Sequence, residues 1–424
     1  MSNRTTKNGG PRTTDNGLLT TDNGLLTTDY GPRTTDYGLR TTDYGPRTIM
    51  VRAPNWVGDA VMALPALREL RRIFANAEIT LVARPWVAGL FEGEGLSDNL
   101  IPVHDARGVY QSARNFVAEA RRLGREKFDL AVLFQNSFGA ALLARVAGAK
   151  KIAGYGTDRR GPLLDLAVPF EPNYKTAHQV RYYLNIAAAL EVEATGETRV
   201  DFARAQPRLH ASDDQRRLGR RMLEEFSIEN VPAAGRPGDG AGQVVAASPH
   251  RPVAPSVAPS PLLALSPGAT NSLAKRWLAE RFAATADRLA ESDGFQTVIV
   301  GTTGDVEVAN EVAARMKTGA IVLAGRTSIA ELKAVLACAS LVLSNDTGTA
   351  HVAAALGVPT VVVFGPTEHF ATRPLSDSAI VVRHDVECSP CMLRECPIDH
   401  RCMTRVEVDD VYTAAQRLLI DAAR

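Results

Sequence analysis

The sequence SNDTGTAH, at residues 344–351, joins a carboxylate and several hydroxyl groups in one short turn. The apolar run before it predicts a strand, and the small residues 349–356 predict a helix that begins within the turn. The free N–H groups and partial positive charge of a helix N-terminus suit an anionic ligand such as a diphosphate. Alternatively, Asp346 or Thr347 simply caps this helix. The ligand-binding candidates here are Asp346, Thr347, Gly348, Thr349 and His351.

A second junction, SPGATNSLAKRW at residues 266–277, follows the apolar run LLAL. The pattern predicts a strand, then a loop of small and hydroxylated residues, then a helix from about residue 278 to 290. Ser266 and Thr270 could donate hydroxyl groups to a phosphate, and Lys275 could supply a point charge. The spacing is not that of a Walker A loop, and Lys275 could equally be an exposed lysine at a helix start. Two such junctions in one α/β unit favour a nucleotide diphosphate as ligand.

The third candidate is Asp59, the last residue of the loop PNWVGD at residues 54–59. An apolar strand precedes this loop, and residues 60–74 have the spacing of an amphipathic helix. A carboxylate at such a junction could take a proton from an acceptor hydroxyl that attacks a bound sugar nucleotide. Because Asp59 precedes a helix, a capping role is the alternative.

Apolar strands that alternate with helices must position these three junctions, and this alternation predicts parallel, doubly wound sheets. The ligands of such sheets bind at the carboxyl ends of the strands, where all three junctions lie. We therefore expect an α/β protein with two Rossmann-like domains, 49–229 and 262–424, that face a central cleft. The expected strands are 49–52, 79–83, 100–103, 130–134, 151–153, 262–265, 297–301, 320–323, 341–344, 360–364 and 379–382.

Two segments lack any pattern that could form a core. Residues 11–45 repeat a seven-residue unit of the type LRTTDYG, and the glycine in each copy excludes a coiled coil. We expect a disordered tail at residues 1–48. Residues 230–261 are rich in proline, glycine, alanine and serine, which predicts a linker or a flexible insertion.

The composition limits the class of protein. The 424 residues carry a formal net charge of +1, which gives no global electrostatic basis for binding nucleic acid. No apolar run approaches the ~20 residues of a membrane span. The polar N-terminus does not resemble a secretory signal. We therefore expect a cytoplasmic protein.

Four of the five cysteines cluster near the C-terminus, at Cys388, Cys391, Cys396 and Cys402. Their spacing loosely resembles a zinc knuckle, so a zinc ion bound by these four thiolates stays an open alternative. The spacing lacks the paired regularity of zinc sites, and it favours free thiols in a tight loop. A cytosolic setting disfavours a disulfide.

The residues of these segments resemble glycosyltransferase family 9, the bacterial ADP-heptose:lipopolysaccharide heptosyltransferases. The similarity lies in VRAPNWVGDAVMALPAL at 51–67, in the loop that ends at Trp277, in the turn at 345–351 and in the cysteine segment 388–403. It covers residues 50–424 except 230–261. The resemblance implies a GT-B fold and an inverting transfer of heptose from ADP-heptose to the first heptose of the lipopolysaccharide inner core.

The resemblance also implies roles for single residues. Asp59 corresponds to the general base, and Lys275 to the residue that stabilises the diphosphate leaving group. Asp346 would bind the heptose hydroxyls or a nearby donor group, and residues 347–349 the phosphates. His351 either orients the turn or packs in the core. No redox cofactor and no obligatory metal are implied. The acceptor would be a lipid A-linked inner-core oligosaccharide, with peripheral contact to the cytoplasmic face of the inner membrane.

Three alternatives remain at this point. A family 9 transferase could use another heptose acceptor, including the Kdo-proximal position, although the cysteine segment favours the acceptor named above. A GT-B-like epimerase could act on a UDP-sugar. A non-catalytic module could bind a sugar nucleotide, but Asp59 together with Lys275 argues against it, because a pure binder needs no base.

Overall fold

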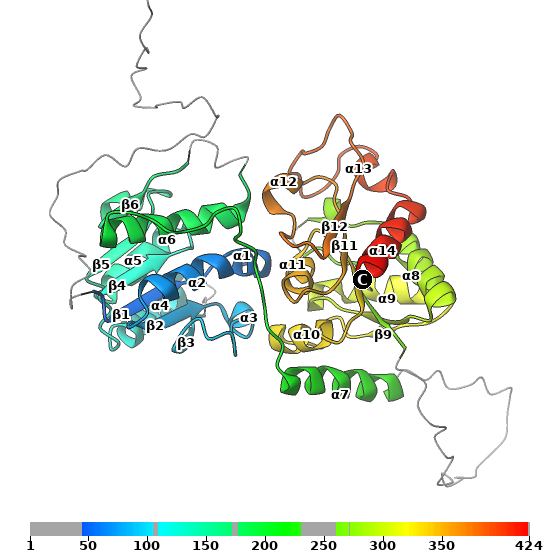
Figure 1. The fold of residues 1–424 in the computed structure, drawn as a ribbon, viewed down its shortest axis with the longest axis horizontal. Coiled ribbons are helices and arrows are strands. Elements are labelled where there is room, and N and C mark those ends of the chain that lie inside the picture. Colours follow the sequence, from blue (N-terminus) through cyan, green and yellow to red (C-terminus); the bar gives the residue numbers. More distant parts are fainter. Residues whose placement is uncertain (1–44, 105–108, 172–176, 230–259, 271, 423–424) are drawn as a thin grey trace, which may run out of the picture.

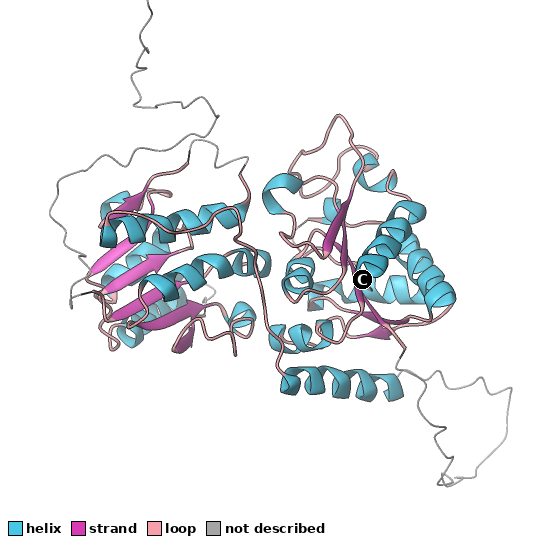
Figure 2. Cartoon of the chain, viewed as in Figure 1, coloured by secondary structure: helices cyan, strands magenta, loops and turns pink. Residues whose placement is uncertain are grey.

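The computed structural model describes residues 45–104, 109–171, 177–229, 260–270 and 272–422. Most of the tail expected at 1–48 and of the linker expected at 230–261 lies outside these residues. The described chain forms two six-stranded sheets, each parallel throughout, in two halves that lie beside one another (Figure 1). Helices surround the strands of each half (Figure 2). This is the doubly wound α/β architecture that the alternating pattern predicts.

The first sheet has the strand order β3-β2-β1-β4-β5-β6. Ile49 and Val51 of its central strand pack in one apolar cluster, and Met50 between them packs in another. Because successive side chains of a strand point to opposite faces, helices must cover both sides of this sheet. The strands are β1 (Thr48–Arg52), β2 (Glu78–Ala83), β3 (Asn99–Pro102), β4 (Leu130–Leu133), β5 (Lys151–Tyr155) and β6 (Leu166–Val168). The helices are α1 (Val57–Met62), α2 (Leu64–Ile73), α3 (Pro85–Ala88), α4 (Val109–Leu123), α5 (Phe138–Val146), η1 (Gly161–Leu163) and α6 (Gln179–Thr195).

The second sheet, with the order β12-β11-β10-β7-β8-β9, repeats the topology of the first. Its strands are β7 (Leu262–Ser266), β8 (Gln296–Ile299), β9 (Ile321–Val322), β10 (Leu341–Asn345), β11 (Thr360–Val363) and β12 (Ala379–Val382). Its longer helices are α8 (Ala279–Asp293), α9 (Val306–Arg315), α10 (Ile329–Leu336), α11 (Gly348–Ala355) and α14 (Val408–Ala422). Its short helices are η2 (Leu273–Lys275), η3 (Thr303–Asp305), α12 (His369–Thr372) and α13 (Arg401–Thr404).

All the strands expected from the sequence are present, with ends shifted by at most two residues. The edge strand β6 was not expected, because its three residues are too few to show a pattern. The helix expected at 60–74 is divided at Ala63. Pro65 has no N–H to donate to the Val61 carbonyl, which explains the division. The first piece begins at Val57, so Asp59 lies in the first turn of α1 and not in the preceding loop, where we expected it.

The chain crosses to the second half earlier than the boundary expected at residue 229. Helix α7 (Asp213–Glu229) packs along α10 and against β9, below the second sheet in Figure 1. The Leu209 N–H donates to the Ala355 carbonyl, and Arg216 Nη1 donates to the Ala337 carbonyl over 2.6 Å. Helix α7 therefore belongs with the second half, although we had grouped it with the first.

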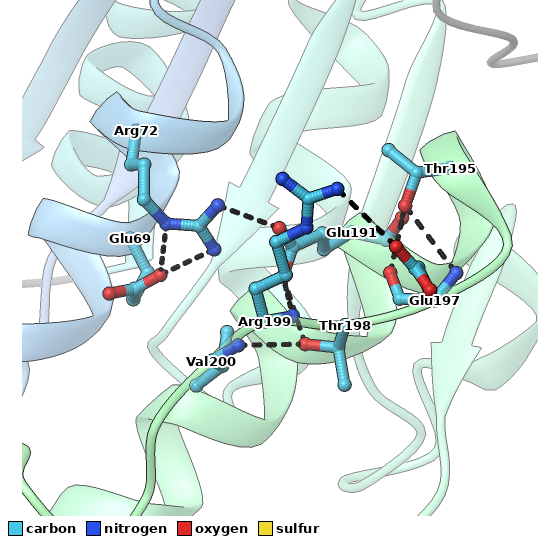
Figure 3. A network of polar contacts seen from close by, with 8 residues as sticks. All are labelled: Glu69, Arg72, Glu191, Thr195, Glu197, Thr198, Arg199 and Val200. Carbon is cyan, nitrogen blue, oxygen red and sulfur yellow. Dashed lines mark hydrogen bonds and ion pairs between the residues drawn. The ribbon is translucent and has the colours of Figure 1, made fainter.

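A network of polar contacts holds α2 against α6 (Figure 3). Arg72 Nη1 lies 2.7 Å from Glu191 Oε1, and the other carboxylate oxygen accepts hydrogen bonds from the Arg199 N–H (2.8 Å) and the Thr198 hydroxyl (2.9 Å). The chain passes directly from α1 into α2, so this network also fixes where α1 lies relative to α6.

A buried ion pair joins the two halves. Lys333 Nζ of α10 lies 2.6 Å from Glu94 Oε1, in the segment after α3, and both side chains are fully buried. Nearer the strand ends, His178 Nε2 lies 2.8 Å from the Arg373 carbonyl oxygen, which connects the start of α6 with the end of α12.

Candidate active site

The candidate site forms where the loops after β1, β7 and β10 approach one another. In both sheets the chain order reverses between two central strands, β1 and β4 in the first and β7 and β10 in the second. Such a reversal opens a crevice at the carboxyl ends of the strands. Asp59 follows β1, Lys275 follows β7, and Asp346 follows β10. The strand order thus places all three candidates at these two reversals.

The first turns of α1 and α11 touch across the two halves. A Cβ atom added at Gly348 would lie 2.7 Å from Val57 Cβ, and one added at Gly58 would lie 3.1 Å from His351 Cδ2. Both helices can approach this closely only because glycine stands at these positions. Gly348, expected from the sequence to bind phosphate, therefore also permits the contact between the halves.

Asp346 holds Lys275 and does not cap a helix. Its Oδ2 atom accepts hydrogen bonds from Lys275 Nζ and from the Thr367 hydroxyl, each over 2.7 Å. The N-cap residue of α11 is Thr347, and within the described residues no side-chain hydrogen bond caps this helix. The Thr347 hydroxyl lies 3.1 Å from the Ser344 hydroxyl instead. Thr347 thus holds the N-cap position without a capping hydrogen bond from its side chain, Asp346 does not cap the helix, and the N-terminus of α11 keeps its partial positive charge.

Asn345, which the sequence analysis missed, connects the two loops of the second sheet. Its side chain is fully buried; Oδ1 accepts from the Trp277 N–H (2.9 Å) and Nδ2 donates to the Pro267 carbonyl (2.7 Å). The sequence feature that could have indicated Asn345 is a polar residue at the end of an otherwise apolar strand. Ser266 is buried at the end of β7, whereas Thr270 is exposed, with its hydroxyl 3.4 Å from that of Thr302.

Asp59 is a partly buried carboxylate in the third position of α1. Its Oδ1 atom accepts a hydrogen bond from the Tyr183 hydroxyl over 3.1 Å. Burial raises the pKa of Asp59 above its usual range, while the Tyr183 bond and the charge of Lys275 oppose that shift. The cap of α1 is Trp56, so Asp59 is not a capping residue. A carboxylate with a raised pKa, opposite a lysine from the other half, has the properties of a proton acceptor.

His351 is a packed residue at the contact between α1 and α11. Its side chain is 5% exposed and its ring lies against Gly58. Burial lowers the pKa of His351 to about 4, so the imidazole is neutral at pH 7. This position agrees with a packing role, and the neutral ring adds no charge to the site.

The four clustered cysteines lie between β12 and the end of α13, and all are free thiols. Burial, followed by the three neighbouring cysteines, raises the pKa of Cys402 to about 11. Within the described ranges, no group of three or more His, Cys, Asp or Glu side chains is arranged to hold a metal ion. No helix in the same ranges is long and apolar enough to cross a membrane.

Comparison with known proteins identifies the family. The model of the family described as glycosyltransferase family 9 (heptosyltransferase) matches residues 117–401. The chain belongs to glycosyltransferase family 9. Family 9 membership confirms that the protein is a glycosyltransferase, and it removes the support for an epimerase or a non-catalytic binding module.

Curated relatives and solved structures agree with this family 9 assignment. Lipopolysaccharide heptosyltransferase 2 of Escherichia coli is 28% identical over 344 residues, which cover 79% of this chain and 87% of the relative. Lipooligosaccharide heptosyltransferase 2 of Campylobacter jejuni is 27% identical over 377 residues, 88% of this chain and 98% of the relative. The structure of E. coli ADP-heptose lps heptosyltransferase II matches with a TM-score of 0.70 at 23% identity, over 89% of this chain and 100% of that one. The expected GT-B fold is confirmed.

Proposed function

We propose that this glycosyltransferase moves a heptose from ADP-heptose onto the first heptose of the lipopolysaccharide inner core. The names of the relatives in E. coli and C. jejuni support the donor class and the acceptor position. The observation that carries the proposal is the contact between the first turn of α1, which holds Asp59, and that of α11, which begins two residues after the Asp346 that binds Lys275. The charge of Lys275 in addition acts to lower the pKa of Asp59.

The second half would bind the donor. The diphosphate would lie at the N-terminus of α11, where no side-chain hydrogen bond caps the helix within the described residues, and residues 347–349 would contact it with Lys275 beside them. Ser266 and Thr270 would line the loop after β7. Asp346, which forms an ion pair with Lys275, would contact the heptose hydroxyls or a nearby donor group. The first half would bind the acceptor.

The chemistry is one displacement at the anomeric carbon. Asp59 takes the proton of the acceptor hydroxyl, and the acceptor oxygen forms a bond to C1 of the heptose. The bond between C1 and the β-phosphate oxygen breaks, and its electron pair leaves with ADP. Lys275 and the N-terminus of α11 stabilise the negative charge that develops on the diphosphate. Attack from the side opposite the leaving group inverts the configuration at C1, and the step includes no cofactor.

The acceptor also suggests where the reaction takes place. Because the acceptor sugar is attached to lipid A, the protein would meet it at the cytoplasmic face of the inner membrane as a peripheral, cytoplasmic enzyme. Co-sedimentation with vesicles that contain truncated lipopolysaccharide would test this contact, and vesicles without it serve as the control. Equal sedimentation with both kinds of vesicle would show that the acceptor does not cause the contact with the membrane.

Asp59→Asn tests the proposal. Purified protein is incubated with ADP-heptose and a set of truncated lipopolysaccharide acceptors, and the products are identified by mass spectrometry. We expect the wild type to add one heptose only to acceptors that end in the first heptose, and the variant to lose roughly 10²–10⁴-fold in rate while it binds ADP normally. Asp213→Asn, at an exposed aspartate of α7, is the matched control. Transfer to acceptors that end in Kdo, or near-full turnover by Asp59→Asn, would overturn the proposal.

A further inference from the structure

We propose that Tyr183 is a positioning residue for the transfer, which holds the Asp59 carboxylate in the orientation that accepts the proton. The inference rests on the proposed function of Asp59 as the base. Tyr183 lies on α6, 124 positions away in the sequence, and its hydroxyl donates to Asp59 Oδ1 over 3.1 Å. The bond occupies one carboxylate oxygen and leaves Oδ2 for the acceptor hydroxyl.

The Tyr183 ring is held in one place by its neighbours. Its side chain is 4% exposed. The rings of Phe134 and Tyr182 meet it edge-on, each with a centroid separation of 5.5 Å. Edge-to-face aromatic pairs of this kind restrict the ring and add stability beyond the area they bury. The hydroxyl therefore reaches Asp59 from a fixed position.

The helices that carry the two residues are also fixed relative to one another. The Arg72–Glu191 ion pair joins α2 to α6 (Figure 3). Helix α1, which carries Asp59, leads directly into α2. A carboxylate in the first turn of a short helix would otherwise rotate among several conformers. A hydrogen bond from a rigid donor selects one of them, and such preorganisation lowers the cost of reaching the reactive geometry.

The pKa of Asp59 depends on the Tyr183 hydroxyl and on the charged and titratable groups nearby. Lys275 faces it from the loop after β7, and like Tyr183 it lowers the pKa. His351 approaches from α11 and is neutral. His178 at the start of α6, whose charge would act on His351, has a pKa lowered by burial. Burial raises the pKa of Tyr183 well above its usual range, so the phenol stays protonated and remains a donor throughout the neutral range.

Removing only the phenol oxygen tests the proposal. We expect Tyr183→Phe to lower kcat on the order of tenfold, as for the loss of a hydrogen bond to a charged group. Because that bond favours the ionised carboxylate, its loss should raise the pKa of Asp59 and shift the acid limb of kcat/KM to higher pH. The KM for the donor should stay unchanged. Tyr155→Phe is the matched control, because its hydroxyl donates to the Tyr182 carbonyl (2.6 Å) within the same half.

A second variant covers the case in which Tyr183→Phe fails to fold. Replacing Tyr183 by 3-fluorotyrosine keeps the hydroxyl but makes it a stronger donor, so the acid limb should move to lower pH. An unchanged acid limb in the folded phenylalanine variant, or in the fluorotyrosine protein, would overturn the inference. If Asp59→Asn is inactive while both Tyr183 variants behave as wild type, only this inference fails. If Asp59→Asn is active, Asp59 is not the base, and the proposed function fails whatever the Tyr183 variants show.

Discussion

Lys275 Nζ lies 2.7 Å from Asp346 Oδ2, and this ion pair joins the loops that follow the two central strands of the second sheet. The Asp346 side chain is 7% exposed and that of Lys275 is 27% exposed, so the ammonium group is the more accessible member of the pair. Under the proposed function, a bound diphosphate would share Lys275 without breaking the pair. Asp346 would then hold the lysine in place for the donor.

We expect Lys275→Ala to weaken donor binding and to slow the chemical step together. The positive charge interacts with the diphosphate in the ground state, and more strongly as the bond to C1 breaks. Donor affinity is measured by calorimetry with ADP, and the chemical step by single-turnover kinetics. Lys317→Ala, an exposed lysine of the same half, is the control. If both constants of Lys275→Ala equal those of the wild type, the residue is not part of the site.

Gly348→Ala should disturb the contact between the halves. Its new Cβ would lie 2.7 Å from Val57 Cβ, and atoms at that distance must move apart. We expect a higher KM for the donor and a lower melting temperature. Gly139→Ala is the control, because a Cβ there meets no atom within 4 Å, and in α5 it should be neutral or slightly stabilising. Identical kinetics for the two variants would show that the contact between α1 and α11 is dispensable.

The sequence predicted the strands and the three junctions because both depend on local patterns. The rule that ligands bind at the carboxyl ends of parallel strands then predicts that Asp59, Lys275 and Asp346 lie at one site. Tyr183 and Asn345 could not be predicted, because their hydrogen-bond partners lie 124 and 68 positions away and no local pattern marks such a bond. For the same reason the expected domain boundary was wrong at α7, because the residues of this helix do not show which half its apolar face packs against.

The clustered cysteines should differ in their reaction with alkylating agents. Cys391 is exposed, whereas Cys402 is buried and its pKa is raised to about 11, so at pH 8 almost none of it is thiolate. We expect iodoacetamide to modify Cys391 first and Cys402 only after unfolding, as read by peptide mass spectrometry. Elemental analysis of the untreated protein tests the alternative: about one zinc per chain, lost with stability on chelation, would contradict a loop of free thiols.

Glu191→Gln should lower the free energy of unfolding by roughly 1–3 kcal/mol, because it weakens several charge-assisted bonds at a buried position. Burial alone would raise the pKa of Glu191, but Arg72 and the bonds from Arg199 and Thr198 lower it overall. A lowered pKa stabilises the fold at neutral pH, and this contribution is lost as the pH falls through the folded value. Urea titrations should therefore show the difference at pH 7 and a smaller one at pH 3. A difference independent of pH would assign the effect to packing.

The buried pair of Glu94 and Lys333 has a consequence for how the two halves move. If the two halves separated at this ion pair, both charges would stay buried without a partner or would have to become hydrated. Either outcome costs about 3–5 kcal/mol. The contact between α1 and α11 is made by two glycines, Val57 and the neutral ring of His351, and separating them carries no such cost. When substrates enter and products leave, we therefore expect the halves to rotate about an axis near Lys333. Small-angle scattering should find this range of motion widened in Lys333→Met.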